Sequence, residues 1–153
     1  MEIIKFSPKI DTKTDRKLDK ACSNFNRLLL ELKKKALKNE IVELINKEIE
    51  HLNTISDSSK VLKSEIKKKQ LKIVKQVEQK AKIVVKHHYR NLWLAIGMSA
   101  FGLPLGIGFG MALDNMALLG LGLPIGMVIG MSVGINIDNK AKAEGRQLDF
   151  EIG

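Results

Sequence analysis

The sequence predicts an all-α protein: a basic helical bundle or coiled coil followed by a two-helix transmembrane glycine-zipper hairpin. Three observations support this fold class. Two apolar runs of 23 residues, 91–113 and 115–137, hold no charged side chain and are separated only by Asp114. Glycines recur at every fourth position within both runs. The residues before them are rich in lysine, and their apolar side chains recur at the three-to-four-residue spacing of amphipathic helices.

Charge and hydropathy divide the chain into three segments. Residues 1–90 carry a formal charge of +11, against +9 for the whole chain, and are expected to form a basic cytoplasmic helical region. Residues 91–137 are expected to form the transmembrane hairpin, and residues 138–153 a cytoplasmic tail. The first segment is long enough for a small hydrophobic core. Its narrow apolar stripes and few aromatic residues favour further stabilisation by oligomerisation through coiled-coil packing.

Three amphipathic helices are predicted in the basic region, after an irregular start at residues 1–12. The first helix spans about 13–37 and the second spans 40–55. The third begins near Ser58, a residue suited to an N-cap, and can continue unbroken into the membrane. The positions expected to form the core are Leu18, Cys22, Phe25, Leu29 and Leu32 in the first helix, Val42, Ile45, Ile49 and Leu52 in the second, and Leu62, Ile66, Ile73, Val77, Ala81 and Val84 in the third.

The only cysteine, Cys22, excludes an internal disulfide. Its neighbours along the predicted helix, Ala21, Phe25 and Leu28, are apolar. This environment favours a small buried core residue over a reactive thiol.

The two apolar runs have the length and the composition of membrane-spanning helices. At about 1.5 Å per residue each run reaches roughly 35 Å, against a hydrocarbon core of about 30 Å. Glycine costs about 1 kcal/mol per helix position in water, whereas in lipid small residues let two helices approach closely. The glycines spaced four residues apart are expected to pack the helices together: Gly102, Gly106 and Gly110 in the first run, and Gly122, Gly126, Gly130 and Gly134 in the second.

The two runs also repeat one another. The segment FGLPLGIGFGMAL, residues 101–113, matches LGLPIGMVIGMSV at an offset of 20 residues. The repeat places Pro104 and Pro124 in equivalent positions, where each is expected to kink or loosen its helix. Asp114 and Asn115 suit a turn, so the two helices are predicted to pack antiparallel.

The residues that flank the hairpin predict its orientation. Lys86 precedes it and Lys140, Lys142 and Arg146 follow it, whereas the turn carries no lysine or arginine. The excess of positive charge places both termini in the cytoplasm. The residues expected at the membrane–water interface are His87, His88, Tyr89, Arg90 and Trp93.

The pattern GLPIGMVIGMSVGINIDNKAKAEGRQL is similar to the glycine-zipper membrane hairpins of small bacterial proteins. Those hairpins often end in a similar tail, matched here by Asp138, Lys140, Ala141, Glu144, Gly145, Arg146, Gln147 and Leu148. The resemblance covers roughly the last 60 residues. It implies an integral membrane location, expected to be the bacterial inner membrane, with close helix packing, and it implies no reaction.

No catalytic, metal or cofactor motif emerges from the sequence. The histidines His51, His87 and His88 form neither an HExxH motif nor a chelating pair, and the glycines lack the GKS/GKT ending of a phosphate loop. Asp114 is an ionisable residue within an apolar stretch, but its place beside Asn115 favours a turn that reaches water. An enzyme is therefore not expected, and neither a cofactor nor a small-molecule substrate is inferred.

Three functions are compatible with these features. The first is a bilayer anchor for a basic helical region that assembles with itself or with an unidentified protein. The second is an oligomeric pore-forming or membrane-perturbing effector, in which the basic region gates the pore or senses a trigger. The third is a membrane-tethered nucleic-acid binder, which the scarcity of aromatic side chains disfavours. The anchor ranks first, with lysines that face solvent or anionic lipid.

Overall fold

The computed structural model describes residues 1–10, 12, 15–56 and 58–152. For Leu118 it describes the backbone only. The described part is helical, as the sequence predicts, and contains no β-strand. It forms two compact units. The first comprises residues 1–84 and 148–152, and the second comprises residues 85–147.

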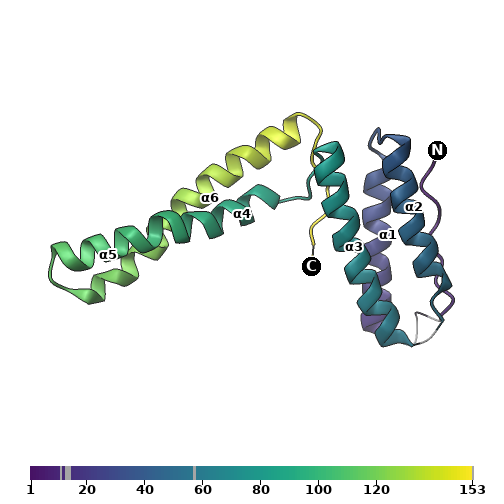
Figure 1. Ribbon diagram of the computed structural model, residues 1–153, viewed down its shortest axis with the longest axis horizontal. Coiled ribbons are helices and arrows are strands. Elements are labelled where there is room, and N and C mark those ends of the chain that lie inside the picture. The colour runs from purple at the N-terminus through teal and green to yellow at the C-terminus, as the bar shows by residue number, and fades with distance from the viewer. Residues whose placement is uncertain (11, 13–14, 57, 153) are drawn as a thin grey trace. The chain divides into compact units, whose positions relative to one another are not determined.

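The first unit is a three-helix bundle (Figure 1). Its helices are α1 (Arg16–Lys33), α2 (Asn39–Thr54) and α3 (Ser59–Ala81). Helix α3 packs against both α1 and α2. Asp15 caps α1 by accepting hydrogen bonds from the N–H groups of Lys17 and Leu18, and Ser58 caps α3, as predicted. Both caps satisfy N–H groups that the first turn of a helix leaves without a partner.

The apolar spacing identified the core of the bundle. Every predicted core position of the first two helices is buried, and so are five of the six in the third. The sixth, Ala81, is partly exposed. Helix α1 ends at Lys33 rather than near residue 37, and α2 begins one residue earlier than predicted. The spacing did not identify the buried apolar residues Leu28, Ile41 and Val74, nor the two polar side chains that the bundle buries, Glu48 and Gln70.

The irregular start of the chain is an extended segment that two asparagines of α2 hold in place. Each side-chain amide donates to one backbone C=O of the segment and accepts from the N–H two residues later: Asn46 binds Glu2 and Ile4, and Asn53 binds Lys5 and Ser7. Seven residues of helix and three residues of extended chain both advance about 10 Å, so the two repeats stay in register. Ile3 and Phe6 are buried, and Phe6 meets the ring of Phe25 edge-on at 5.1 Å.

The third helix does not continue into the apolar stretch, so that prediction is wrong. Helix α3 ends at Ala81, and Lys82 adopts a left-handed conformation (φ 56°). Residues 83–85 are β-branched and buried but not helical, and the N–H of Leu148 donates to the C=O of Val84. The helix therefore ends at a left-handed residue, and the three β-branched side chains that follow are buried outside it. The predicted tail is divided accordingly, because Leu148 and Phe150 are buried in the bundle.

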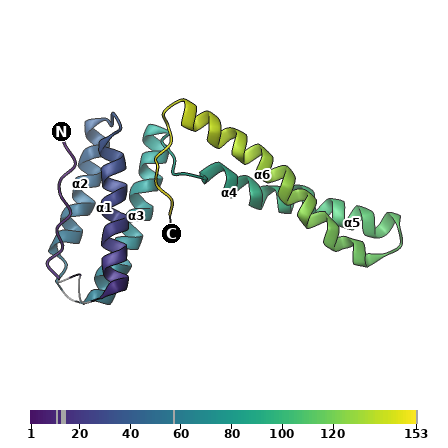
Figure 2. The same cartoon turned by 180° about the vertical axis from the view of Figure 1, so that it is seen from behind.

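The second unit is an antiparallel helical hairpin (Figures 1 and 2). Its first arm, His88–Ala112, consists of α4 (His88–Gly97), a π-helical segment (Met98–Gly102) and α5 (Leu103–Ala112). A short 3₁₀ turn, Met116–Leu118, leads into the second arm, α6 (Leu119–Ala143). Helix α6 packs along α4, the π-helical segment and α5. The arms therefore begin before residue 91 and end after residue 137, beyond the predicted limits of the hairpin.

Candidate functional site: the apolar hairpin

The two arms meet through glycine backbones. A Cβ atom added to Gly126 would lie 2.6 Å from the Cα of Gly102, and one added to Gly122 would lie 2.6 Å from the Cα of Gly106. At the other end of the contact, a Cβ atom on Gly134 would lie 2.5 Å from the Cα of Arg90. Real Cβ atoms do not approach backbone this closely, so a larger residue at these positions would force the arms apart.

The seven glycines singled out in the sequence are all buried on this contact, but they are not equally tight. Around Gly106 the nearest atom to an added Cβ is the C=O oxygen of Leu119, at 2.5 Å. Around Gly110 it is the sulfur of Met116, at 3.3 Å, which a side-chain rotation can move. Two further glycines, Gly108 and Gly120, have nothing within 4 Å of an added Cβ. They provide matched controls that differ from the packed glycines only in their environment.

Gly97 also belongs to this face, although the four-residue spacing did not identify it. An added Cβ there would lie 2.7 Å from the Cα of Gly130. Gly97 and Gly102 are five residues apart, and the π-helical segment lies between them. Its wider turn, in which the N–H of Leu103 bonds to the C=O of Met98, accommodates one extra residue and keeps Gly97 on the same face. A search that allows one five-residue step would have found it.

The two equivalent prolines have different surroundings. Pro104 is the second residue of α5, separated by one residue from the π-helical segment, and it lacks the N–H of a regular helical residue. Pro124 lies inside α6, which is helical without interruption. The C=O group that Pro124 leaves without its usual donor belongs to Gly120, in the first turn of α6. The sequence repeat therefore does not produce two arms of identical backbone geometry.

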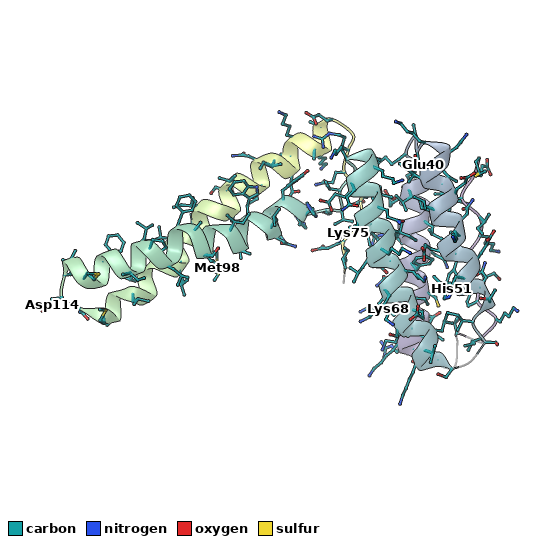
Figure 3. The ribbon with its side chains drawn as sticks, in the orientation of Figure 1. Glu40, His51, Lys68, Lys75, Met98 and Asp114 are labelled. Atoms are coloured by element: carbon teal, nitrogen blue, oxygen red, sulfur yellow. The ribbon has the colours of Figure 1, made fainter. Side chains whose placement is uncertain are left out.

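The turn at the tip uses both polar residues assigned to it. Asp114 is exposed and adopts a left-handed conformation (φ 47°), which aspartate tolerates better than most residues. Asn115 donates its N–H to the C=O of Gly110 at 2.9 Å, and its side chain accepts from the N–H of Ala117 at 3.0 Å. Asp114 lies at the tip of the hairpin in Figure 3.

Large apolar side chains cover the outside of the hairpin. Figure 3 shows side chains projecting outward along both arms. In α5 every residue except Gly106 and Gly110 is exposed, and in α6 the buried residues are four glycines, Asp138 and Ala141. Met111 is 71% exposed. Both arms, each of 25 residues, are long and apolar enough to cross a membrane.

The open end of the hairpin is closed by Asp138, which the sequence analysis placed only in the tail. Asp138 lies four residues beyond Gly134, at the next step of the packed face, and is 6% exposed. Its two oxygens accept the N–H groups of Tyr89 (3.1 Å) and Arg90 (2.9 Å), in the first turn of α4. A carboxylate at this position satisfies unpaired N–H groups and complements the helix dipole. The sequence contains a signal for this role: an acidic residue stands four positions after Gly134, where the spacing of the glycines would continue.

The predicted interface residues gather at this end of the hairpin. His87 (φ 61°) precedes α4 and provides no side-chain cap, so Asp138 takes over that role from the other arm. The rings of His88 and Tyr89 meet edge-on at 5.0 Å, and the guanidinium of Arg90 donates to Asn91. The backbone of Trp93 lies against Gly130. Within the described residues, no group of three or more His, Cys, Asp or Glu side chains is placed to hold a metal ion.

The bundle contains a buried carboxylate, Glu48, that is paired with two lysines. Glu48 of α2 is buried and pairs with Lys69 (2.7 Å) and Lys72 (2.6 Å) of α3. Burial acts to raise the pKa of the Glu48 carboxyl, but the hydrogen bonds and charges of the two lysines together outweigh it and lower that pKa. This arrangement joins two helices and offers no free acid or base for catalysis.

Cys22 lies in the core of the bundle, as the sequence predicts. Burial, with a smaller contribution from the charge of Asp19, raises the pKa of its thiol to about 11. The thiolate is therefore scarce at neutral pH, and the side chain acts as a small apolar group.

Comparison with known proteins gives no assignment. The chain matches no protein-family model. No curated protein and no solved structure is significantly similar to it. The resemblance of its C-terminal part to bacterial glycine-zipper hairpins therefore stays a prediction.

Proposed function

We propose that this is a small integral membrane protein, in which the glycine-packed hairpin anchors a basic helical bundle that serves assembly or interaction. One observation carries the proposal: the hairpin exposes its large apolar side chains and buries glycines. Soluble monomers rarely expose a contiguous apolar patch larger than a few hundred Å². Lipid removes the cost of exposing such a surface, which in water is about 25 cal/mol per Å².

The packing between the arms supports the same proposal. Lipid tails are as apolar as leucine, so no hydrophobic force drives two helices together within a bilayer. Close backbone approach through small residues supplies dispersion contacts instead, and the packed glycines have this arrangement. The outward-facing serines do not disturb it, because Ser99 and Ser132 donate their hydroxyls to backbone C=O groups of their own helices.

An orientation follows from the antiparallel hairpin. Its open end carries Lys86, Arg90, Lys140 and Lys142, and its tip carries Asp114 without any lysine or arginine. We therefore infer that the open end and both termini face the cytoplasm, by the positive-inside rule. The resemblance of the C-terminal part adds the bacterial inner membrane as the expected compartment.

A labelling experiment tests the anchor and its orientation together. In a Cys22→Ala background, Asp114→Cys is expected to react with a membrane-impermeant maleimide only from outside the cell. Lys20→Cys, on an exposed position of α1, is expected to react only after the membrane is opened. Both variants are expected to remain with the membrane during alkaline carbonate extraction. Release by carbonate, or labelling of both sites from the same side, contradicts the proposal.

The pore hypothesis ranks second on the same geometry. A water-filled channel needs polar groups along one face of its helices. Here the glycine face is used within the hairpin, and the outward faces are apolar. Ion flux from liposomes that contain inserted protein, abolished by Gly126→Leu, would move the pore to first place.

A further inference from the structure

A cavity of about 250 Å³ lies at the open end of the hairpin, between the start of α4 and the last turns of α6. Lys86 and Arg90 line it on the α4 side, and Lys142 lines it from α6. The side chains of Asn139 and Gln147 add amide groups to the wall. Its volume is below the usual range for a drug-sized ligand, about 300–1,000 Å³, and suits a smaller polar group.

The lining of the cavity is positively charged. Two lysines, one arginine and His87 share the lining with one acidic residue, Asp138. The oxygens of Asp138 are engaged by the backbone N–H groups of Tyr89 and Arg90, so the carboxylate is fixed at the helix start. Arg90 uses its Nε and one terminal nitrogen on Asn91, which leaves donors of its five N–H groups for a ligand. An anion that accepts several hydrogen bonds fits this set of donors.

The cavity also lies where charged residues give way to apolar ones. Along one face of α6, Ile135 lines it toward the middle of the hairpin, and Lys142 lines it two turns later. Residues between Ile135 and the tip on α6 carry no charge. A ligand at this position meets cations on one side and, on the other, the apolar surface that we assign to lipid.

We propose that this cavity binds the phosphate group of an anionic phospholipid, whose acyl chains lie along the apolar surface beyond Ile135. The assignment rests on the proposed membrane anchor, which places the open end at the cytoplasmic interface. Basic pockets between membrane helices on that side are suited to anionic head groups. The adjoining apolar surface favours a lipid over free phosphate, although both offer the same phosphate chemistry.

The test is lipid retention by the full-length protein. The protein is reconstituted in bilayers of phosphatidylcholine with phosphatidylglycerol, extracted in mild detergent, and examined by native mass spectrometry for bound lipid. Wild-type protein is expected to retain phosphatidylglycerol in preference to phosphatidylcholine. Arg90→Gln/Lys142→Gln is expected to lower that preference about tenfold or more, because charge-assisted hydrogen bonds are lost. Lys142→Gln alone, on an exposed last turn of α6, is expected to lower it in part.

The matched control is Lys140→Gln/Arg146→Gln, which removes the same charge from the same end of the hairpin without touching the cavity lining. Retention in this control at the wild-type level supports a site. An equal loss in both double variants overturns it in favour of diffuse surface attraction. Binding of inorganic phosphate in lipid-free detergent without retention of phosphatidylglycerol overturns the lipid assignment. Wild-type protein that carbonate extracts overturns the anchor and the site together, whereas inserted protein without lipid preference overturns the site alone.

Discussion

The two units of this protein use apolar side chains in opposite ways. Phe25 in the bundle is 0% exposed, whereas Phe101 on the hairpin is 46% exposed. The bundle buries leucine, isoleucine and phenylalanine and turns lysine outward, as a protein in water does. The hairpin buries glycine and turns leucine, isoleucine and phenylalanine outward. Because lipid removes the cost of an outward apolar surface, this contrast supports the proposal that the hairpin lies in a bilayer.

The units also differ in how their helices are stabilised at the ends. In the bundle, Asp15 and Ser58 cap the helices that follow them directly in the chain. In the hairpin, α4 receives its cap from Asp138, 48 residues away from Arg90. A local cap stabilises the helix start without any residue from a distant part of the chain. A cap from the opposite arm forms only when the hairpin closes, so the stability of α4 is tied to the packing of the glycine face.

The most destabilising substitution is predicted at a glycine that packs the two arms of the hairpin together. Gly126→Leu is expected to separate the arms, because its side chain would occupy the space of the Gly102 backbone. The loss should exceed about 3 kcal/mol, at the upper end of single substitutions. Amide exchange of residues 91–137 in detergent measures it, with Gly120→Leu as the control because Gly120 has open space around it. Equal protection in the two variants, or unchanged protection in Gly126→Leu, contradicts the packing role of the glycines.

The second prediction compares the stability lost when Phe25 or Phe101 is replaced by alanine. Phe25→Ala is expected to destabilise the bundle by about 3–5 kcal/mol, because it opens a cavity in a closely packed core and removes the contact with Phe6. Phe101→Ala removes the same atoms from an exposed site and should leave the bundle unchanged. Thermal unfolding of the full-length protein in detergent, followed by circular dichroism, compares the two. Similar losses from both would show that the hairpin packs its apolar surface within the protein.

The third effect concerns the distant cap. Asp138→Ala is expected to weaken the start of α4 by about 1–2 kcal/mol, since two N–H groups lose a charged acceptor. Faster amide exchange at Tyr89 and Arg90 reports it. Asn139→Ala, at the adjacent exposed position of α6, is the control and should leave those amides protected. The cap assignment fails if Asp138→Ala leaves the exchange of both amides as slow as in the wild-type protein.

The smallest effect is the pH dependence of the bundle. The pKa of Glu48 is lowered in the folded state, so its pairing with Lys69 and Lys72 stabilises fully above the unfolded value, about 4.3. That contribution is lost as the pH falls through the lower folded-state pKa. At pH 7, Glu48→Gln is expected to cost about 1 kcal/mol, because both lysines can still reach water. Unfolding midpoints of the two proteins should approach one another as the pH falls from the unfolded-state pKa through the lower folded-state pKa of Glu48; a constant difference contradicts the ion-pair account.

The helical class, the core of the bundle and the two apolar arms can all be predicted from the sequence. These features follow from local periodicity, in which apolar residues three or four apart share one helix face. The same periodicity identified six packed glycines of the hairpin along with the looser Gly110. The turn was predicted from residue type: Asp114 and Asn115 are residues that favour turns, and Asp114 has the left-handed backbone of one.

Three features could not be predicted from local spacing: the end of α3, the place of Gly97 among the packed glycines and the capping role of Asp138. Residues 83–85 are compatible with a helix by spacing, yet they are buried in a non-helical backbone. A π-helical turn shifts the glycine spacing from four to five residues. The cap on α4 joins Asp138 to Arg90 and Tyr89, which lie 48 and 49 positions earlier in the chain. In each case the local sequence is compatible with more than one arrangement, and contacts with distant parts of the chain determine which one forms.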